Sequence, residues 1–443
     1  MGIAETAKQA KKASIQLGAV KTDAKNNALA EIAKALKQNT DKIVSANKKD
    51  LAAAEKSKLA APLLKRLKFD ENKIADVVTG IGSLIKLDDP VGKTLSATEL
   101  DKGLELYKVS CPIGVIGVIF ESRPDALVQI STLCLKSGNA VLLKGGSEAQ
   151  HTNKILADTI RETCEKAGMP KGWLGLMETR AEVAEILKMD EYIDLLIPRG
   201  SNEFVQHIMN NTNIPVLGHA EGICHVYVDG EADLEMAVNI VVDSKCQYVA
   251  VCNAAETLLV DEKIAKKFLP KVKAALGERG VDSTPRLRSG QASSPQVEIR
   301  GCEKTRSIID VKPAQEKDWS TEYLDYIISI KVVDGLDEAI EHINRYGSRH
   351  TDTIITANKG KAKKFMDLVD SANVFWNCST RFSDGFRYGL GAEVGISTNK
   401  IHARGPVGLE GLVIYKWKLI GSGQIVANYS GNDAKKFTHK KLM

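Results

Sequence analysis

The chain has few cysteines, and they do not come in pairs. Eight cysteines are spread over 443 residues, and none forms a C-x-x-C pair. Zinc sites and disulfide frameworks use closely spaced cysteines, so we expect neither, and we predict no metal site. Isolated, reduced thiols are typical of a reducing compartment, so we expect a cytoplasmic protein.

Long apolar runs and blocks of one charge are also missing. No apolar run approaches about 18 residues, the length that spans a bilayer, and the N-terminal stretch MGIAETAKQAKKAS has no apolar signal core. We therefore expect neither a secretory signal nor a membrane span. The net charge is only +5 and the basic residues are scattered. This pattern disfavours nucleic acid as a partner and favours a small anionic ligand.

Several common catalytic motifs are absent. The phosphate loop G-x-x-x-x-G-K-S/T does not occur, nor do H-E-x-x-H and G-x-S-x-G. The nearest approach to G-x-G-x-x-G is GLGAEVG at 389–395, which has one residue too many and follows no expected strand. A standard dinucleotide fingerprint and a serine hydrolase are therefore unsupported. Cysteine remains as the candidate nucleophile.

The residue pattern predicts an α/β protein of two or more domains, because 443 residues exceed the usual size of one core. The first 70 residues have helical spacing, as in Leu29, Ile32, Ala33 and Leu36, with Thr22 or Asp23 as the expected cap. From about residue 110 short apolar runs alternate with helical stretches such as 152–167 and 264–276. The expected strands are 115–120, 140–144, 193–198, 224–228, 256–260 and 352–356. This alternation predicts largely parallel sheets covered on both faces.

The stretch SKCQYVAVCNAAETLLV at 244–260 contains two of the cysteines. Cys252, next to Asn253, lies at the junction between a loop and an expected strand, whereas Cys246 lies in the more polar DSKCQY. A thiolate attacks acyl carbons well, but a single cysteine is more often a packing residue. The residues alone leave both interpretations open.

Seven segments in order carry a family resemblance. They are VSCPIGVIGVIFESRPD, SGNAVLLKGGSEA, IPRGS, GHAEGICHVYVDGEADL, VCNAAETLLV, VVDGLDEAIEHINRYGSRHTDTI and VFWNCSTRFSDGFRYGLGAEVGISTNKIHARGPVGLEGL. Together they resemble the γ-glutamyl phosphate reductases, a branch of the aldehyde dehydrogenase superfamily, from about residue 5 to 425. The chain also resembles the C-terminal half of the pyrroline-5-carboxylate synthases, without their kinase half.

The resemblance implies an aldehyde dehydrogenase-like fold with two parallel-sheet α/β domains and a β arm for oligomerisation. The NADP-binding domain would comprise residues 1–97 and 113–221, and the catalytic domain 222–400. The arm would combine 98–112, with Gly103 in its turn, and 401–425, with a strand near 409–420. Residues 426–443 would form a polar tail. An arm with an open edge implies a homodimer or homotetramer.

The resemblance also implies a reaction. The superfamily nucleophile follows a Glu-Gly element by about thirty residues, and Cys252 follows Glu221 by 31 positions (252 − 221). Its thiolate would attack L-glutamyl 5-phosphate, and the resulting thioester would be reduced to L-glutamate 5-semialdehyde, the second step of proline biosynthesis from glutamate. The backbone N–H of Cys252 and the amide of Asn253 would stabilise the oxyanion. Glu221 matches the general base of hydrolytic members, and a base role and a structural role both remain open.

The implied cofactor is NADPH. Lys144 matches the lysine that binds the adenosine ribose, and Ser147 stands where NAD-preferring members often have a glutamate that would repel a 2′-phosphate. Arg199 would contact phosphate or form an ordinary surface ion pair. The residues assigned to the cofactor are Lys144, Ser147, Arg199, Gly200, Ser201, Glu221, Gly222 and Glu322.

The substrate carries oxyanions, which arginine binds well. We assign Ser122, Arg123, Arg381 and Arg404 to the substrate. Ser122 stands where hydrolytic members carry an oxyanion asparagine, and Arg387 is a further candidate. His350 is interpreted as a histidine that hydrogen-bonds a neighbour rather than a catalytic group. A γ-glutamyl kinase is a candidate partner, because it would make the labile substrate.

Three other functions remain as alternatives. A CoA-acylating or hydrolytic aldehyde dehydrogenase would share the fold, but the segments ESRPD and TRFSDG resemble only the γ-glutamyl phosphate branch. A catalytically silent assembly protein is disfavoured by the presence of Cys252 and Lys144. A cysteine hydrolase lacks a suitable His and Asn partner set.

Overall fold

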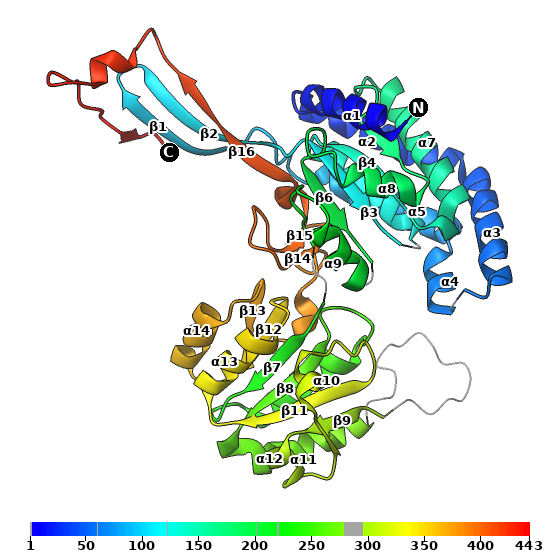
Figure 1. Cartoon of the computed structure of the whole chain (residues 1–443), viewed down its shortest axis with the longest axis vertical. Helices are drawn as coiled ribbons and strands as arrows, with labels where there is room; N and C mark the ends of the chain where they lie inside the picture. Colours follow the sequence, from blue (N-terminus) through cyan, green and yellow to red (C-terminus); the bar gives the residue numbers. More distant parts are fainter. Residues whose placement is uncertain (1, 60, 122, 201, 219–220, 279–295) are drawn as a thin grey trace. The chain divides into compact units, whose positions relative to one another are not determined.

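The computed structural model describes residues 2–59, 61–121, 123–200, 202–218, 221–278 and 296–443 (Figure 1). The chain divides into two compact units. Unit 1 comprises Met1–Gly218, Leu390–Gly395 and Val407–Met443, and unit 2 comprises His219–Gly389 and Ile396–Pro406. Two short strands, β14 (Gly395–Ser397) and β15 (Gly405–Val407), pair with each other, and the boundaries between the two ranges of the chain fall within them.

Unit 1 begins with helices, as the spacing predicts. They are α1 (Ile3–Leu17), α2 (Thr22–Gln38), α3 (Thr40–Lys56), α4 (Ala61–Leu67) and α5 (Glu71–Lys86). Leu29, Ile32 and Leu36 form the buried face of α2. The predicted cap is wrong: Lys21 occupies the N-cap position without a side-chain hydrogen bond. The Thr22 hydroxyl instead donates to Asp89 Oδ2 at 2.8 Å, because a partner distant in sequence competes with local capping.

A four-stranded parallel sheet forms the centre of unit 1, in the order β5-β4-β3-β6. Its strands are β3 (Val115–Ile119), β4 (Ala140–Lys144), β5 (Leu174–Leu176) and β6 (Leu195–Pro198), and its helices are α6 (Pro124–Lys136), α7 (Gln150–Lys166), α8 (Arg180–Ile186) and α9 (Asn202–Asn210). Every residue of β3, β4 and β6 is buried, as expected for strands covered on both faces. The strand order reverses at β3, and the carboxyl ends of β3 and β6 flank this switch point, the usual place for a ligand.

An antiparallel sheet in the order β16-β2-β1-β17 forms the arm. The hairpin of β1 (Thr94–Asp101) and β2 (Leu104–Pro112) turns at Gly103, whose φ of +72° favours glycine. β16 (Val413–Ile420) pairs with β2 along its whole length. Residues expected only as a polar tail contribute β17 (Lys440–Lys441), which pairs with Thr98 and Glu99 of β1.

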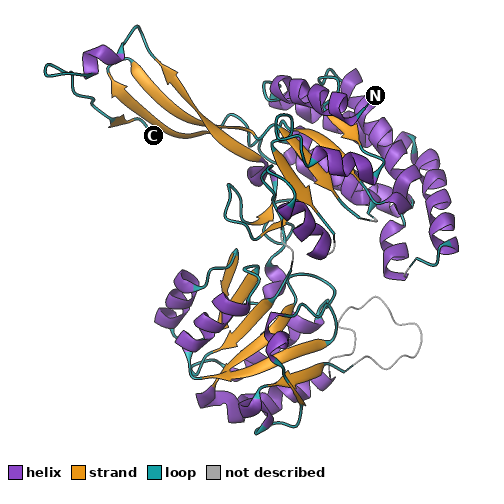
Figure 2. Ribbon diagram, viewed as in Figure 1, coloured by secondary structure: helices purple, strands orange, loops and turns teal. Residues whose placement is uncertain are grey.

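Unit 2 contains a seven-stranded, all-parallel sheet in the order β10-β9-β11-β8-β7-β12-β13 (Figure 2). Its strands are β7 (Cys224–Val228), β8 (Ala255–Asp261), β9 (Glu298–Gly301), β10 (Lys312–Pro313), β11 (Ile327–Val333), β12 (Thr351–Ile355) and β13 (Asn373–Trp376). Its helices are α10 (Leu234–Cys246), α11 (Glu262–Glu278), α12 (Glu303–Arg306), α13 (Leu336–Tyr346) and α14 (Lys359–Leu368).

Alternate residues of the central strands pack on opposite faces of this sheet. Val226 and Leu258 belong to one apolar cluster with residues of α10 and α11. Their neighbours Tyr227 and Leu259 belong to a second cluster with residues of α13 and α14. This period of two buries both faces and fixes the register of the strands.

The predicted fold class is confirmed, and each predicted strand overlaps an observed strand. The region 409–420 differs in part, because 409–412 form a 3-10 turn before β16. The stretch GVDSTPRLRSGQASSP at 280–295, whose composition predicts a loop, lies outside the described residues. None of the described helices combines the length and the apolar content needed to cross a bilayer.

Candidate active site

Cys252 lies at the amino edge of the sheet in unit 2. α10 ends at Cys246 and β8 begins at Ala255, so Cys252 belongs to the connecting loop that precedes the strand. Its side chain is partly exposed. Cys246, in contrast, packs against the apolar cluster beside α10, and burial raises the pKa of its thiol to about 11. Cys246 therefore has the environment of a packing residue.

Gly222 lies directly against Cys252. A Cβ atom on Gly222 would be 2.1 Å from the carbonyl oxygen of Cys252 and 2.4 Å from its Cα, so no side chain fits there. The Glu-Gly element and the cysteine, separated by about thirty residues in sequence, thus share one site because β7 and β8 are adjacent parallel strands. The backbone contact defines how closely the two loops approach.

A second thiol forms a hydrogen bond with the backbone of the Cys252 loop. Cys224, the first residue of β7, donates from Sγ to the carbonyl oxygen of Cys252 at 3.2 Å. Burial raises the pKa of Cys224 well above its ordinary value, so this sulfur stays protonated and remains a donor. The sequence patterns gave no signal for this contact.

Asn253 is 5% exposed and is held by the segment 379–383. Its Nδ2 donates to the carbonyl oxygen of Ser383 at 2.7 Å, and Thr380 Oγ1 donates to the Asn253 carbonyl at 2.7 Å. One amide N–H of Asn253 is thus committed to the protein, which leaves the other for the predicted oxyanion contact. The Oδ1 atom is buried with no hydrogen-bond partner among the described residues.

The arginines assigned to the substrate have different surroundings. Arg381 is 8% exposed, and its Nε donates to Gln247 Oε1 at 2.9 Å, within the Cys252 loop. Burial and the charge of Arg387 lower the pKa of Arg381, while a charge on Cys252 raises it. Arg404 instead contacts Asp370 and the carbonyl of Thr398. The structure therefore brings Arg381, and not Arg404, into contact with the cysteine loop.

Three other predicted residues lie in unit 2. Glu221 is exposed, and it makes no side-chain hydrogen bond or ion pair within the described part of the chain. Glu322 lies close enough to Glu256 for its charge to raise the pKa of that carboxyl. His350 is buried, with Nδ1 2.8 Å from Thr351 Oγ1 and 3.7 Å from Cys224 Sγ. This position is consistent with a histidine that supports neighbouring groups.

The residues assigned to the cofactor in unit 1 share the carboxyl edge of its sheet. Lys144 is the last residue of β4 and is 8% exposed, whereas Ser147, in the turn η1 (Ser147–Ala149), is exposed. Arg199 and Gly200 follow β6 directly. A cation at a glycine turn after one strand and an arginine after the other fit an anionic dinucleotide at the switch point. Ser122 and Ser201 lie outside the described residues.

The structure adds Glu182 to the surroundings of Lys144. Burial would raise the pKa of Glu182, but hydrogen bonds from Thr179 and Glu178 and the charge of Lys144 lower it overall. Glu182 also completes a capping box with Thr179 at the start of α8. The T-x-x-E spacing was visible in the sequence, but its proximity to Lys144 requires the fold.

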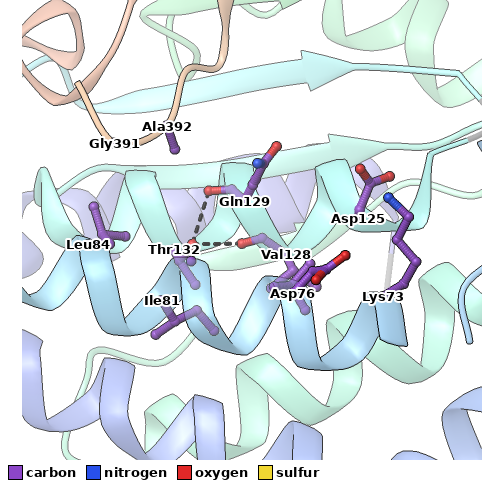
Figure 3. A pocket seen from close by; sticks show the side chains of 12 residues that line it. Lys73, Asp76, Ile81, Leu84, Asp125, Val128, Gln129, Thr132, Gly391 and Ala392 are labelled. Carbon is purple, nitrogen blue, oxygen red and sulfur yellow. Dashed lines mark hydrogen bonds between the residues drawn. The ribbon is translucent and has the colours of Figure 1, made fainter. Parts of the chain in front are cut away.

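Unit 1 also contains a cavity of about 170 Å³ between α5, α6 and residues 391–392 (Figure 3). Lys73 and Asp125 lie at one end and Leu84 at the other. Asp125 forms a 3.0 Å ion pair with Arg123, which links the cavity to the ESRPD segment. The sequence did not predict this cavity, because α5 and α6 are far apart along the chain.

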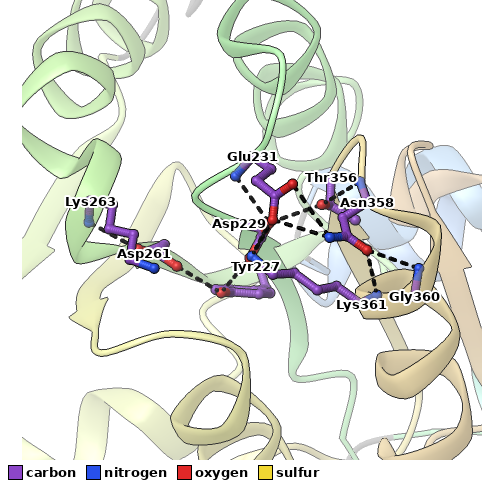
Figure 4. Close-up of polar contacts among 9 residues, drawn as sticks. All are labelled: Tyr227, Asp229, Glu231, Asp261, Lys263, Thr356, Asn358, Gly360 and Lys361. Atoms are coloured by element: carbon purple, nitrogen blue, oxygen red, sulfur yellow. Dashed lines mark hydrogen bonds and ion pairs between the residues drawn. The ribbon is translucent and has the colours of Figure 1, made fainter.

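The carboxyl edge of the sheet in unit 2 is filled by a polar cluster (Figure 4). Asp229, which follows β7 and is completely buried, accepts hydrogen bonds from Lys361 Nζ, Thr356 Oγ1 and the backbone N–H of Glu231. The Tyr227 hydroxyl donates to Asp229 at 3.2 Å. The place where such sheets often bind ligands is thus occupied by the protein's own ion pair.

The chain matches a family model described as the aldehyde dehydrogenase family over residues 2–322. The chain belongs to this family, in its gamma-glutamyl phosphate reductase branch. Gamma-glutamyl phosphate reductase from Acetivibrio thermocellus is 65% identical over 442 residues, covering 100% of this chain and 99% of the relative. That from Pelotomaculum thermopropionicum is 64% identical, covering 100% and 98%.

A solved structure supports membership of the same branch. The crystal structure of gamma-glutamyl phosphate reductase from Thermotoga maritima matches with a TM-score of 0.90 and 42% identity, over 96% of this chain and 100% of that one. An acetylating aldehyde dehydrogenase from Geobacillus thermoglucosidasius, at 17% identity and a TM-score of 0.64, covers 96% and 97% and shares the fold. Family membership makes this chain an oxidoreductase that uses a nicotinamide cofactor.

Proposed function

We propose that this chain reduces L-glutamyl 5-phosphate to L-glutamate 5-semialdehyde with NADPH and releases phosphate, the second step of proline biosynthesis. The contact of Gly222 with Cys252 carries the proposal, because it unites the Glu-Gly element and the nucleophile at one site. The relatives at 64–65% identity bear the name of this activity.

In the proposed reaction Cys252 acts as the nucleophile. Its thiolate attacks the acyl carbon, a carbon–sulfur bond forms, and the carbon–oxygen bond to phosphate breaks. A nicotinamide cofactor, when bound, would supply the hydride that reduces the resulting Cys252 thioester. The thiohemiacetal then collapses to the aldehyde and regenerates the thiolate. The backbone N–H of Cys252 and the remaining N–H of Asn253 would donate to the developing oxyanion.

The proposed cofactor residues and the proposed nucleophile belong to different units of the chain. We propose that unit 1 binds NADPH through Lys144, Ser147, Arg199 and Gly200, with Ser201, and that unit 2 supplies Cys252, Gly222, Glu221 and Glu322. Arg381 is the best placed of the assigned arginines to meet a substrate oxyanion, because it is the one held against the cysteine loop. Ser122, Arg123 and Arg404 are also assigned to the substrate, on the family resemblance.

The preference for NADPH rests on Ser147, which is exposed and uncharged beside Lys144. Lys144→Ala should weaken NADPH binding at least about tenfold, since one charge-assisted contact is lost. Ser147→Glu should shift the preference towards NADH by repelling the 2′-phosphate. Fluorescence titration with both cofactors measures both effects, and unchanged NADPH affinity in Lys144→Ala would remove that lysine from the site.

The proposed function is tested in the oxidising direction. Purified enzyme should form NADPH from glutamate 5-semialdehyde only when inorganic phosphate is present. Turnover that requires CoA, or that proceeds with water alone, would replace this proposal by one of the alternative aldehyde dehydrogenase activities. No turnover in any of the three, with slow alkylation of Cys252, would indicate a silent assembly protein.

The exposed edge of the arm sheet bears on the assembly of the protein. β16 is an edge strand whose large apolar side chains are exposed, including Tyr415 at 50% and Trp417 at 55%. A second copy could cover them, so we propose a homodimer or homotetramer. A γ-glutamyl kinase remains the proposed source of the labile substrate. The scattered cysteines suit the cytosol.

A further inference from the structure

A buried ion pair joins the two ends of the loop that contains Cys252. Lys245 lies in the last turn of α10 and Glu256 is the second residue of β8, and Lys245 Nζ is 2.6 Å from Glu256 Oε2. Both side chains are 0% exposed. Removing two charges from water is unfavourable, and apolar side chains often serve stability as well. The pair is therefore better explained by what it positions.

Glu256 also contacts a third segment. Its Oε1 accepts a hydrogen bond from the backbone N–H of Leu324 at 3.3 Å. Leu324 has a φ of +52°, in the left-handed region that residues other than glycine avoid. The turn at 321–325 thus has an unfavourable backbone at the residue that Glu256 holds, and it contains Glu322.

Several charged or titratable groups face Glu256. Lys245 comes from α10, Cys224 from β7, and Glu322 from the turn. Tyr323, whose ring centroid is 6.0 Å from Lys245 Nζ, also belongs to the turn. Burial raises the pKa of Glu256 to about 7, Lys245 opposes this shift, and Glu322 adds to it.

We propose that Glu256, oriented by Lys245, is a positioning residue that fixes the turn 321–325 relative to the Cys252 loop. The carboxylate reaches both segments from one strand. It can thereby set the distance between the nucleophile and the carboxylate of Glu322. Only the importance of Glu322 for the cofactor rests on the proposed function; the placement of the turn does not.

Two double variants test the proposal. Lys245→Met with Glu256→Gln removes both buried charges but keeps an acceptor for the Leu324 N–H. Lys245→Met with Glu256→Leu removes the charges and the acceptor. Hydrogen exchange of a peptide covering 321–325 should be about tenfold faster in the Leu variant than in the Gln variant, because one hydrogen bond is lost. Equal exchange in two folded variants would overturn the proposal.

Two further measurements separate the loss of the ion pair from the release of the turn 321–325, and the position of that turn from the role of Glu322. The rate of Cys252 alkylation by iodoacetamide should be alike in the two double variants, since both lack the ion pair. A KM for NADPH that rises together with the exchange rate supports the assignment of Glu322. Faster exchange with an unchanged KM would uphold the positioning role and count against the role of Glu322 in the proposed function.

The wild-type protein provides a test if the Leu variant does not fold. A carboxylate accepts a hydrogen bond more strongly than a carboxylic acid does. Protection of the Leu324 amide, corrected for its intrinsic exchange rate, should therefore fall as the pH falls through about 7. A Leu324 amide that exchanges at its intrinsic rate across this range would contradict the proposal.

Discussion

The two edges of the sheet in unit 2 differ in whether their buried polar groups have hydrogen-bond partners. At the amino edge, Asn253 Oδ1 and Ser383 Oγ are buried without a hydrogen-bond partner in the described part of the chain. At the carboxyl edge, Asp229 accepts from four donors. Unsatisfied buried groups cost stability unless something else binds them. The amino edge therefore has polar groups available for a ligand, in agreement with the active site proposed there, whereas those of Asp229 are already bound.

Unit 1 has the opposite arrangement. Its predicted cofactor residues follow β4 and β6, at the carboxyl edge where ligands of such sheets are usually found. A parallel sheet therefore does not by itself reveal which edge is active.

The largest effect should come from Cys252→Ser. A hydroxyl is a much weaker nucleophile than a thiolate, so reduction should fall more than about a thousandfold. The melting temperature and NADPH affinity should stay the same, because the side chain is partly exposed and nearly unchanged in size. Steady-state kinetics measures the turnover, thermal unfolding the melting temperature, and fluorescence titration the NADPH affinity. Retained turnover would place the nucleophile elsewhere.

Gly222→Ala should have the next largest effect. The new methyl group would lie 2.1 Å from the Cys252 carbonyl oxygen, so the loops must separate. We expect kcat to fall about a hundredfold, since a displacement of about 1 Å is enough for this. Gly230→Ala is the control at the other edge, where the methyl group would be 3.2 Å from Asp261. Equal losses of activity in the two variants would refute the functional difference between the edges.

Lys361→Met should affect stability rather than chemistry. It leaves the buried Asp229 carboxylate without its cation, which should cost about 3 kcal/mol of the free energy of unfolding. Burial raises the pKa of Asp229, but hydrogen bonds, first from Lys361, lower it overall below 3.8. Its stabilisation is therefore present at neutral pH and lost as the pH falls through the lowered pKa.

The difference in stability between wild type and Lys361→Met should consequently be largest near neutrality and shrink below about pH 4. Urea unfolding at several pH values measures it, and the alkylation rate of Cys252 serves as the functional control. A changed alkylation rate at pH 7 in the folded variant would show that the two edges are coupled.

The smallest effect should come from Arg404→Gln. Its guanidinium pairs with Asp370, which is itself partly exposed, so the loss of stability should stay below about 1 kcal/mol. Arg381→Gln should raise the KM for the semialdehyde more, because Arg381 is buried beside the cysteine loop. The reverse order in steady-state kinetics would reassign the substrate contact to Arg404.

The strands were predictable because the buried runs 115–120, 140–144 and 224–228 are short, apolar and bounded by turn residues. The site was predictable only through the family resemblance, since Gly222 and Cys252 meet through two adjacent strands. The Lys245–Glu256 pair left no signal, because a lysine at the end of a helix usually lies in solvent. The Asp229–Lys361 pair is 132 residues apart in sequence and also required the fold.

The short strand β17 has a consequence for how copies of the chain can join. It pairs with Thr98 and Glu99 of β1 at one border of the arm sheet, while among the described strands β16 pairs with β2 alone. If β16 pairs with the same strand of another molecule, the β16 edges of both copies are paired in a single two-fold contact. Growth by edge pairing at β16 would then stop at two copies, and β17 would oppose further pairing at Thr98 and Glu99 of β1.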